Sequence, residues 1–178
     1  ATNASYSFIA ALSDNNSTFF CYATNTIGVT TYITNSSTAT LTVFLPPTLA
    51  WLDAANGGAD STWNTTSLNW TNDVGGGVMA FAQTNGVLFD SRGSGSPTVD
   101  LAQSITPYNI TVNAASDYLL SSSGGNGSLV GQGGITKLNS GKLTIDVTNT
   151  LTGATTISGG TLQVGNGDSY GTLSSGPV

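Results

Sequence analysis

The stretch from residue 133 to residue 167 constrains the fold more than any other part of the chain. It is a series of short β-forming bursts, each closed by Gly, Asn or Ser, with no helix-forming run. Leu143, Ile145 and Val147 alternate with polar residues, as expected when successive side chains point to opposite faces of a strand. This spacing predicts a chain that winds into stacked coils, each of which contributes short strands to long sheets.

The composition supports β-structure and turns rather than helices. Only 7% of the 178 residues are charged, against about a quarter in a typical soluble domain, so Ser, Thr, Asn and Gly must supply the polar surface. Asp, Asn, Ser and Gly favour turns, and the acidic residues are all Asp with no Glu. Scarce charge and abundant Thr and Asn are typical of extracellular and cell-surface proteins, and we expect that location.

The charge pattern excludes several classes of partner. The net charge is −6, and the three basic residues, Arg92, Lys137 and Lys142, form no cluster that could follow a nucleic-acid backbone. The longest apolar run, residues 8–12, is far too short to cross a bilayer, so we expect no direct membrane insertion by this segment. That run also lacks the features of a signal peptide, which places any export signal elsewhere.

The residues that most often carry catalysis are missing. The chain has no His, which excludes a Ser-His-Asp or Cys-His arrangement, and Cys21 is the single cysteine, which excludes an internal disulfide and the usual Cys/His zinc site. We therefore expect no enzyme, no cofactor, and no catalytic, cofactor-binding or metal residues. The distant alternative is an Asp-based polysaccharide-degrading β-helix, in which stacking would bring Asp90, Asp100 and Asp117 together.

Two further motifs have a weak resemblance to ligand sites. The turn VGNGDSY at residues 164–170 resembles half of a calcium-binding roll, and SDNNS at residues 13–17 could supply oxygen ligands. Both are interpreted as solvated turns. Trp51, Trp63 and Trp70 could stack on sugars if they were exposed, but a buried lid over the end of a solenoid is the favoured interpretation.

The first 45 residues have a different pattern from the rest. β-rich bursts occur at Ser5–Leu12, Thr18–Thr24 and Ala39–Phe44. FFCYATN followed by ATLTVFLPP resembles the C-terminal half of an immunoglobulin-like domain, with Phe19 where that family has a corner Tyr. The first half of such a domain is absent, so a neighbouring chain would have to supply it. The alternative is a different small sheet that packs directly on the rest of the chain.

The remaining two-thirds resembles the autotransporter-associated β-strand repeat, also called the passenger-associated transport repeat. The resemblance rests on GGITKLNSGKLTI followed by TNTLTGATTISGGTLQVGNG, with Leu151 in place of the usual Tyr. It implies a right-handed parallel β-helix in a large secreted or surface-displayed bacterial protein. With Pro46-Pro47 as a breaker, we expect a partial immunoglobulin-like sheet at 1–45, a linker at 46–49 and a β-helical region at 50–178.

These features together predict a structural function. We expect a stalk, adhesin or extracellular filament subunit whose partners are neighbouring repeats or identical subunits, joined by strand complementation at an uncapped C-terminal SYGTLSSGPV. The alternative is a glycan-binding module of a surface adhesin that uses exposed Trp.

Overall fold

The structure is a computed structural model that describes residues 7–72 and 76–178. The chain divides into two compact units, Ala1–Leu45 and Pro46–Val178. The described part contains no α-helix and only three short 3-10 turns: η1 (Leu12–Asp14), η2 (Ala54–Asn56) and η3 (Ser91–Gly93). The predicted all-β class is confirmed.

The N-terminal unit consists of two antiparallel ribbons. β1 (Thr18–Phe19) pairs with β4 (Ala39–Thr40), and β2 (Tyr22–Ile27) pairs with β3 (Thr30–Asn35). Gly28, with a φ of +65°, opens the two-residue turn between β2 and β3, where a left-handed residue matches the twist of the flanking strands. Among residues 7–45 no side chain is buried, so these ribbons enclose no core. Their immunoglobulin-like identity stays a prediction.

The burst expected at Ser5–Leu12 is not a strand where the structure describes it. Residues 7–11 form no strand, and η1 begins at Leu12. The Asp14 carboxylate accepts a hydrogen bond from the Ala11 N–H, which therefore takes part in a turn rather than a ladder. A strand needs a neighbour, and apolar alternation alone does not provide one.

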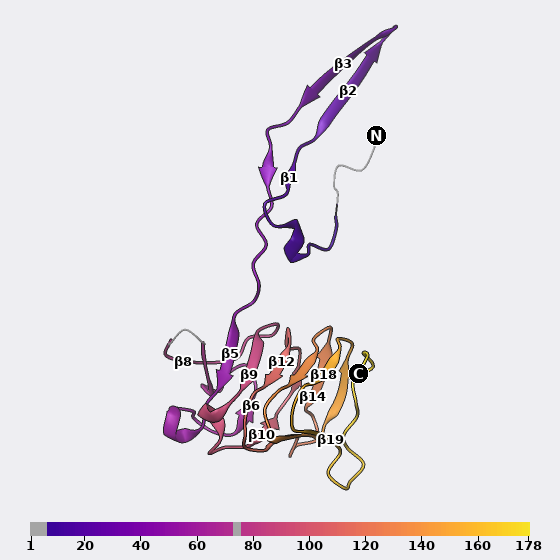
Figure 1. Cartoon of the computed structure of the whole chain (residues 1–178). Coiled ribbons are helices and arrows are strands. Elements are labelled where there is room, and N and C mark those ends of the chain that lie inside the picture. The colour runs from indigo at the N-terminus through magenta and orange to yellow at the C-terminus, as the bar shows by residue number, and fades with distance from the viewer. Residues whose placement is uncertain (1–6, 73–75) are drawn as a thin grey trace. The chain divides into compact units, whose positions relative to one another are not determined.

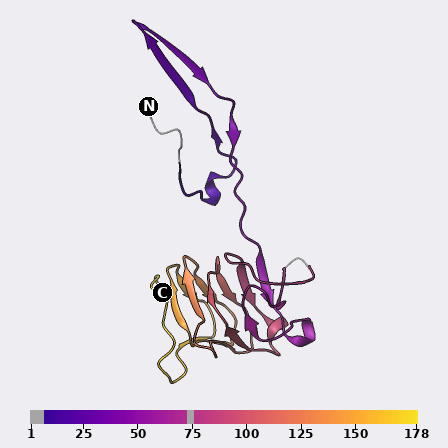
Figure 2. The same cartoon turned by 180° about the vertical axis from the view of Figure 1, so that it is seen from behind.

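The C-terminal unit is a parallel β-solenoid of about three turns, as predicted. Figure 1 shows its strands stacked side by side from β5 to β18, and Figure 2 shows the same stack from behind. The largest sheet has seven strands, in the order β18 (Thr155–Ile157), β15 (Ile135–Lys137), β12 (Ile110–Val112), β9 (Gly86–Phe89), β5 (Thr48–Trp51), β7 (Trp70–Asn72) and β8 (Val78–Met79).

Two further sheets complete each coil. The five-stranded sheet has the order β19 (Thr161–Val164), β16 (Lys142–Ile145), β13 (Tyr118–Ser121), β10 (Thr98–Leu101) and β6 (Thr62–Trp63). The three-stranded sheet has the order β11 (Ser104–Ile105), β14 (Ser128–Gly131) and β17 (Thr148–Leu151). Pairing between coils is parallel throughout, whereas β7 and β8 run antiparallel at one end.

Strict register stacks equivalent side chains into columns inside the solenoid. The period of two in each strand places alternate residues inward. The parallel pairing then places each inward residue beside the inward residue at the equivalent position of the next coil. One column in the five-stranded sheet is Val99, Leu120, Ile145 and Val164. One in the seven-stranded sheet is Leu49, Val87, Ile110, Ile135 and Thr155. The core is therefore a set of one-dimensional ladders, and each coil depends on the coils directly beside it.

Candidate functional site

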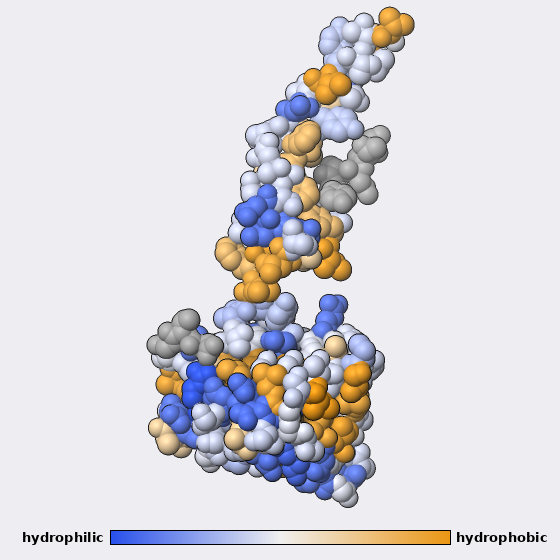
Figure 3. All heavy atoms as spheres, viewed as in Figure 1, coloured by the Kyte–Doolittle hydropathy of each residue, from blue (hydrophilic) through white to orange (hydrophobic). Residues whose placement is uncertain are grey.

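The C-terminal end of the solenoid is open. β18 and β19 are the last strands of their sheets and have a partner on one side only. Ile157 and Val164 occupy columns in which Val112 and Ile145 are fully buried, yet their exposed fractions are 45% and 42%. Figure 3 shows hydrophobic side chains on the surface at this end of the solenoid. Unpaired edge strands together with exposed core positions form a surface suited to another β-strand.

Residues 172–178 begin a further coil on this end. The Thr172 N–H donates to the Val147 carbonyl over 3.2 Å, and the Ser175 N–H donates to the Leu151 carbonyl over 3.0 Å. The Thr155 N–H donates to the Pro177 carbonyl over 2.8 Å. The C-terminal segment, which was expected to lack a cap, is thus partly stacked on β17 and β18. The surface expected to contact another subunit therefore also includes β19.

The opposite end of the solenoid is closed by an aromatic lid. β7 covers the free edge of β5, with Trp70 directly opposite Trp51. Trp63 lies 5.1 Å from Trp70 and 5.4 Å from Phe81 between ring centroids, the separations typical of favourable aromatic pairs. The prediction of a buried lid is confirmed, since all three Trp side chains are fully buried.

The alternative prediction of exposed Trp is therefore wrong. A sugar can stack on an indole only if one face of the ring is accessible, and the lid leaves no accessible face on Trp51, Trp63 or Trp70. Sequence reasoning allowed both interpretations because aromatic residues serve equally well as core and as ligand platforms. The antiparallel pairing of β5 with β7 decides between them.

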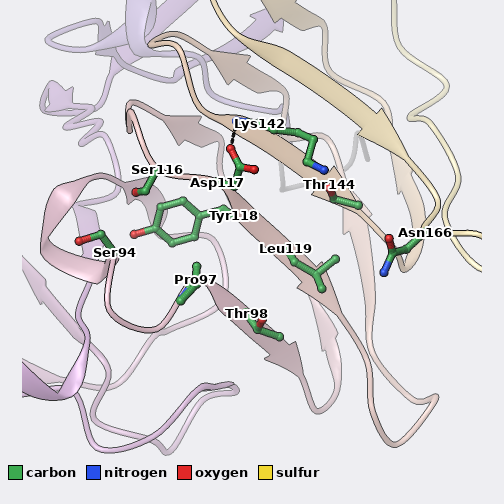
Figure 4. A pocket seen from close by; sticks show the side chains of 10 residues that line it. All are labelled: Ser94, Pro97, Thr98, Ser116, Asp117, Tyr118, Leu119, Lys142, Thr144 and Asn166. Atoms are coloured by element: carbon green, nitrogen blue, oxygen red, sulfur yellow. Dashed lines mark hydrogen bonds between the residues drawn. The ribbon is translucent and has the colours of Figure 1, made fainter.

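The three aspartates considered for polysaccharide chemistry do not come together. In the register of β10 and β13, Ser121 rather than Asp117 lies beside Asp100. Asp90 forms an ion pair with Arg92 at 2.6 Å, and both oxygens of Asp100 accept hydrogen bonds from Ser123. Asp117 accepts the Lys142 N–H over 2.8 Å (Figure 4). Asp90 therefore fixes a local turn, whereas Asp100 and Asp117 each link their own coil to the next one.

A groove on the outer face of the five-stranded sheet contains one of these carboxylates. Its volume is about 330 Å³, and Figure 4 shows Asp117 and Lys142 at one side of it and Leu119 between Thr98 and Thr144. The Lys142 amine reaches the Gln163 side chain over 3.2 Å instead of standing free. Both charged groups in the groove therefore already have partners within the sheet.

The two turns considered for calcium are held by their own backbone. The Asp168 carboxylate accepts the Tyr170 N–H over 2.8 Å, and Asp14 accepts the Ala11 N–H over 2.8 Å. Asp146 contacts the turn at residues 164–170, where its carboxylate accepts the Asn166 N–H. Burial raises the pKa of Asp146, and the nearby Asp168 carboxylate raises it further. Within residues 7–72 and 76–178, no three His, Cys, Asp or Glu side chains gather into a group that could hold a metal ion.

A lysine lies inside the solenoid, which the sequence did not indicate. Lys137 is fully buried in the column of Phe89, Val112 and Ile157. Its ammonium donates to the backbone carbonyls of Leu138 and Asn139, and the Gly159 carbonyl lies 3.4 Å away. Burial lowers the pKa of Lys137, and attraction to Asp117 opposes that shift.

The role of Lys137 is to satisfy carbonyls at a tight corner. A Cβ on Gly160 would lie 2.7 Å from the Lys137 amine, so the glycine turn of the next coil closes directly over it. A buried ammonium without partners is prohibitively costly, but backbone carbonyls from two successive coils compensate here. The lysine therefore links neighbouring coils rather than providing a reactive amine.

Comparison with known proteins bears on the part of the chain that forms the last turns. Residues 135–164, from β15 to the end of β19, match the family model described as passenger-associated-transport-repeat. No curated protein and no solved structure matches the chain. In the described residues, no helix is long and apolar enough to cross a membrane. The matched repeat thus covers one coil and the start of the open end.

Proposed function

We propose that this passenger-associated-transport-repeat solenoid is a stalk segment of a secreted or surface-displayed bacterial autotransporter passenger. The repeat and the β-solenoid together fit a structural passenger segment. The observation that supports the proposal best is the unbroken register of inward-facing columns through successive coils. Each coil adds about 4.8 Å of length and pairs its backbone with the next, which makes a rod that resists bending and proteolysis.

The described charged side chains of the solenoid have structural partners. The Asp90 carboxylate stabilises a local turn, those of Asp100 and Asp117 bond the neighbouring coil, and Lys137 is enclosed by carbonyls. A stalk needs a continuous core, and the inward-facing columns of the solenoid supply one. The repeat family and the fold suggest a structural, non-enzymatic passenger.

The finer part of the proposal concerns assembly into a filament or adhesin. We infer that a strand from a neighbouring repeat or an identical subunit adds to the free edge of β19 and covers Ile157 and Val164. At the other end the aromatic lid buries the core side chains, so the inference concerns the C-terminal end of the solenoid. The N-terminal ribbons, which bury no side chain, provide strands with free edges that suit such an exchange.

Limited proteolysis tests the stalk. Digestion of the intact chain with a non-specific protease should leave a resistant fragment that begins near Pro46, because the N-terminal ribbons have no core to protect them. Rapid digestion of both units at similar rates would show that the solenoid is not a rigid rod and would contradict the proposal.

Sedimentation tests the assembly separately. The wild-type chain should show concentration-dependent association, and Val164→Lys should abolish it by placing a charge at the open end. The matched control, Thr98→Lys, places the same charge on the outer face of β10 and should leave association unchanged. A wild-type chain that is monomeric at all concentrations would refute self-assembly while leaving the stalk in place.

A further inference from the structure

A second groove lies at the corner where the chain passes from the three-stranded to the seven-stranded sheet. Its walls are two successive corners, residues 106–109 between β11 and β12 and residues 131–133 from the last residue of β14 toward β15, with Thr84 beside them. The volume is about 600 Å³, within the range of small-ligand sites. Neither the structural role of the solenoid nor the matched repeat accounts for a hollow of this size.

Glycine at two wall positions keeps the groove open. A Cβ on Gly133 would lie 2.5 Å from the Pro107 carbonyl oxygen, and a Cβ on Gly131 would lie 2.7 Å from the Thr106 methyl group. Gly131 also has a φ of +108°, which residues with a side chain rarely adopt. No side chain from this turn can therefore fill the space.

Tyr108 is the aromatic residue that lines this groove. It is 50% exposed, and its backbone is held in place because the Tyr108 N–H donates to the Asn85 carbonyl over 2.9 Å. Its hydroxyl and the side chains of Thr84, Thr106 and Gln132 form no hydrogen bond within the described part of the chain. The groove thus combines an exposed aromatic residue with unused neutral donors and acceptors around it.

The backbone of Thr84, which lines the groove, is in an unfavourable conformation. Thr84 has a φ of +73°, a left-handed conformation that is unfavourable for a β-branched residue. Its N–H donates to the Thr106 carbonyl over 2.7 Å, which holds it against the corner turn. Strain of this kind concentrates at functional sites, where the surrounding structure maintains it.

We infer that the Tyr108 groove is a binding site for a neutral saccharide. A pyranose ring has an apolar face that can lie on the tyrosine ring, and its equatorial hydroxyls match amide and hydroxyl partners such as Gln132 and Thr84. No ionised side chain lines the groove among the described residues, and the net charge of −6 repels sulfated or uronic sugars. The chemistry therefore selects uncharged hexose or N-acetylhexosamine units.

Binding of the full chain to immobilised oligosaccharides tests this inference. The probes are neutral hexose and N-acetylhexosamine oligomers, with sulfated and uronic-acid oligomers for comparison. Wild-type protein should retain at least one neutral probe, and Tyr108→Ala should weaken retention by about tenfold or more. Tyr108→Phe, which keeps the ring, should bind nearly as well as wild type.

Tyr170→Ala is the matched control, because Tyr170 is 55% exposed in a turn away from the groove and its loss should not change retention. Tyr108 is exposed, so its variants should retain the wild-type melting temperature. The inference is overturned if no neutral probe binds, if acidic probes bind best, or if Tyr108→Ala and Tyr170→Ala behave alike. None of these outcomes affects the stalk.

Discussion

Truncation of one leucine column tests the ladder architecture of the core directly. Leu143 and Leu162 are register partners in β16 and β19, so they are equivalent positions in successive coils. Leu143 is fully buried, with Tyr118 on one side and Leu162 on the other. Leu162 is only partly buried, because no strand covers β19. Leu143→Ala therefore removes packing against strands on both sides, whereas Leu162→Ala removes packing against a strand on one side only.

The expected magnitudes follow from that difference. A fully buried Leu→Ala substitution costs about 2–5 kcal/mol, and we expect about 3 kcal/mol for Leu143→Ala. Leu162→Ala should cost about 1–1.5 kcal/mol, since roughly half of the contacts and of the area removed from water are absent at the open end. With a urea m-value of about 2 kcal/mol/M, the midpoints should fall by about 1.5 M and about 0.6 M.

Equilibrium urea unfolding, followed by far-ultraviolet circular dichroism at a concentration where the chain is monomeric, measures both shifts. Leu119→Ala on the outer face of β13 is the control and should shift the midpoint least, because this half-exposed side chain faces out of the core. Equal costs for Leu143→Ala and Leu162→Ala in the monomer would refute the open end. In an assembled filament the two costs should converge, because the added strand buries Leu162.

Two further predictions concern a buried charge and a close backbone approach. Burial holds the pKa of Lys137 below 10.5, so the folded state binds its proton less tightly than the unfolded state. Stability should therefore rise as the pH increases from that lowered pKa to 10.5, and Lys137→Met should abolish this rise in unfolding titrations. Gly153→Ala should cost about 2 kcal/mol or more, because a Cβ there lies 2.6 Å from the Gly133 backbone, whereas Gly77→Ala, with open space around it, should stay within about 0.5 kcal/mol. A flat pH profile, or equal costs for the two alanines, would contradict these assignments.

Much of the C-terminal unit is readable from local pattern. The alternation of Leu143, Ile145 and Val147 places these residues inward, and all three are buried. The same pattern gives inward positions for Leu162 and Val164, which do occupy the core columns. Alternation predicts which way a side chain points, but it does not reveal whether another coil lies on top of it, and Val164 is 42% exposed for that reason.

The candidate sites were less accessible to sequence reasoning. Lys137 follows Ile135 at a spacing of two, which is an inward position, yet a lysine is ordinarily assigned to the surface. Only the carbonyls that the corner turns supply make its burial tolerable. Tyr108 gave no signal either, because the groove beside it is formed by glycine turns from a different coil.

The sequence by itself determined that the chain is all-β, that a passenger-type repeat is present and that catalytic triads and Cys/His zinc sites are excluded, because these depend on residue identity and local period. The tertiary structure decided which end of the solenoid is closed, which aromatic residues are accessible and which hydrogen-bond donors the carboxylates bind. Those outcomes depend on register between coils about 20–25 residues apart, and a local pattern carries no information about which residue of the next coil will lie alongside.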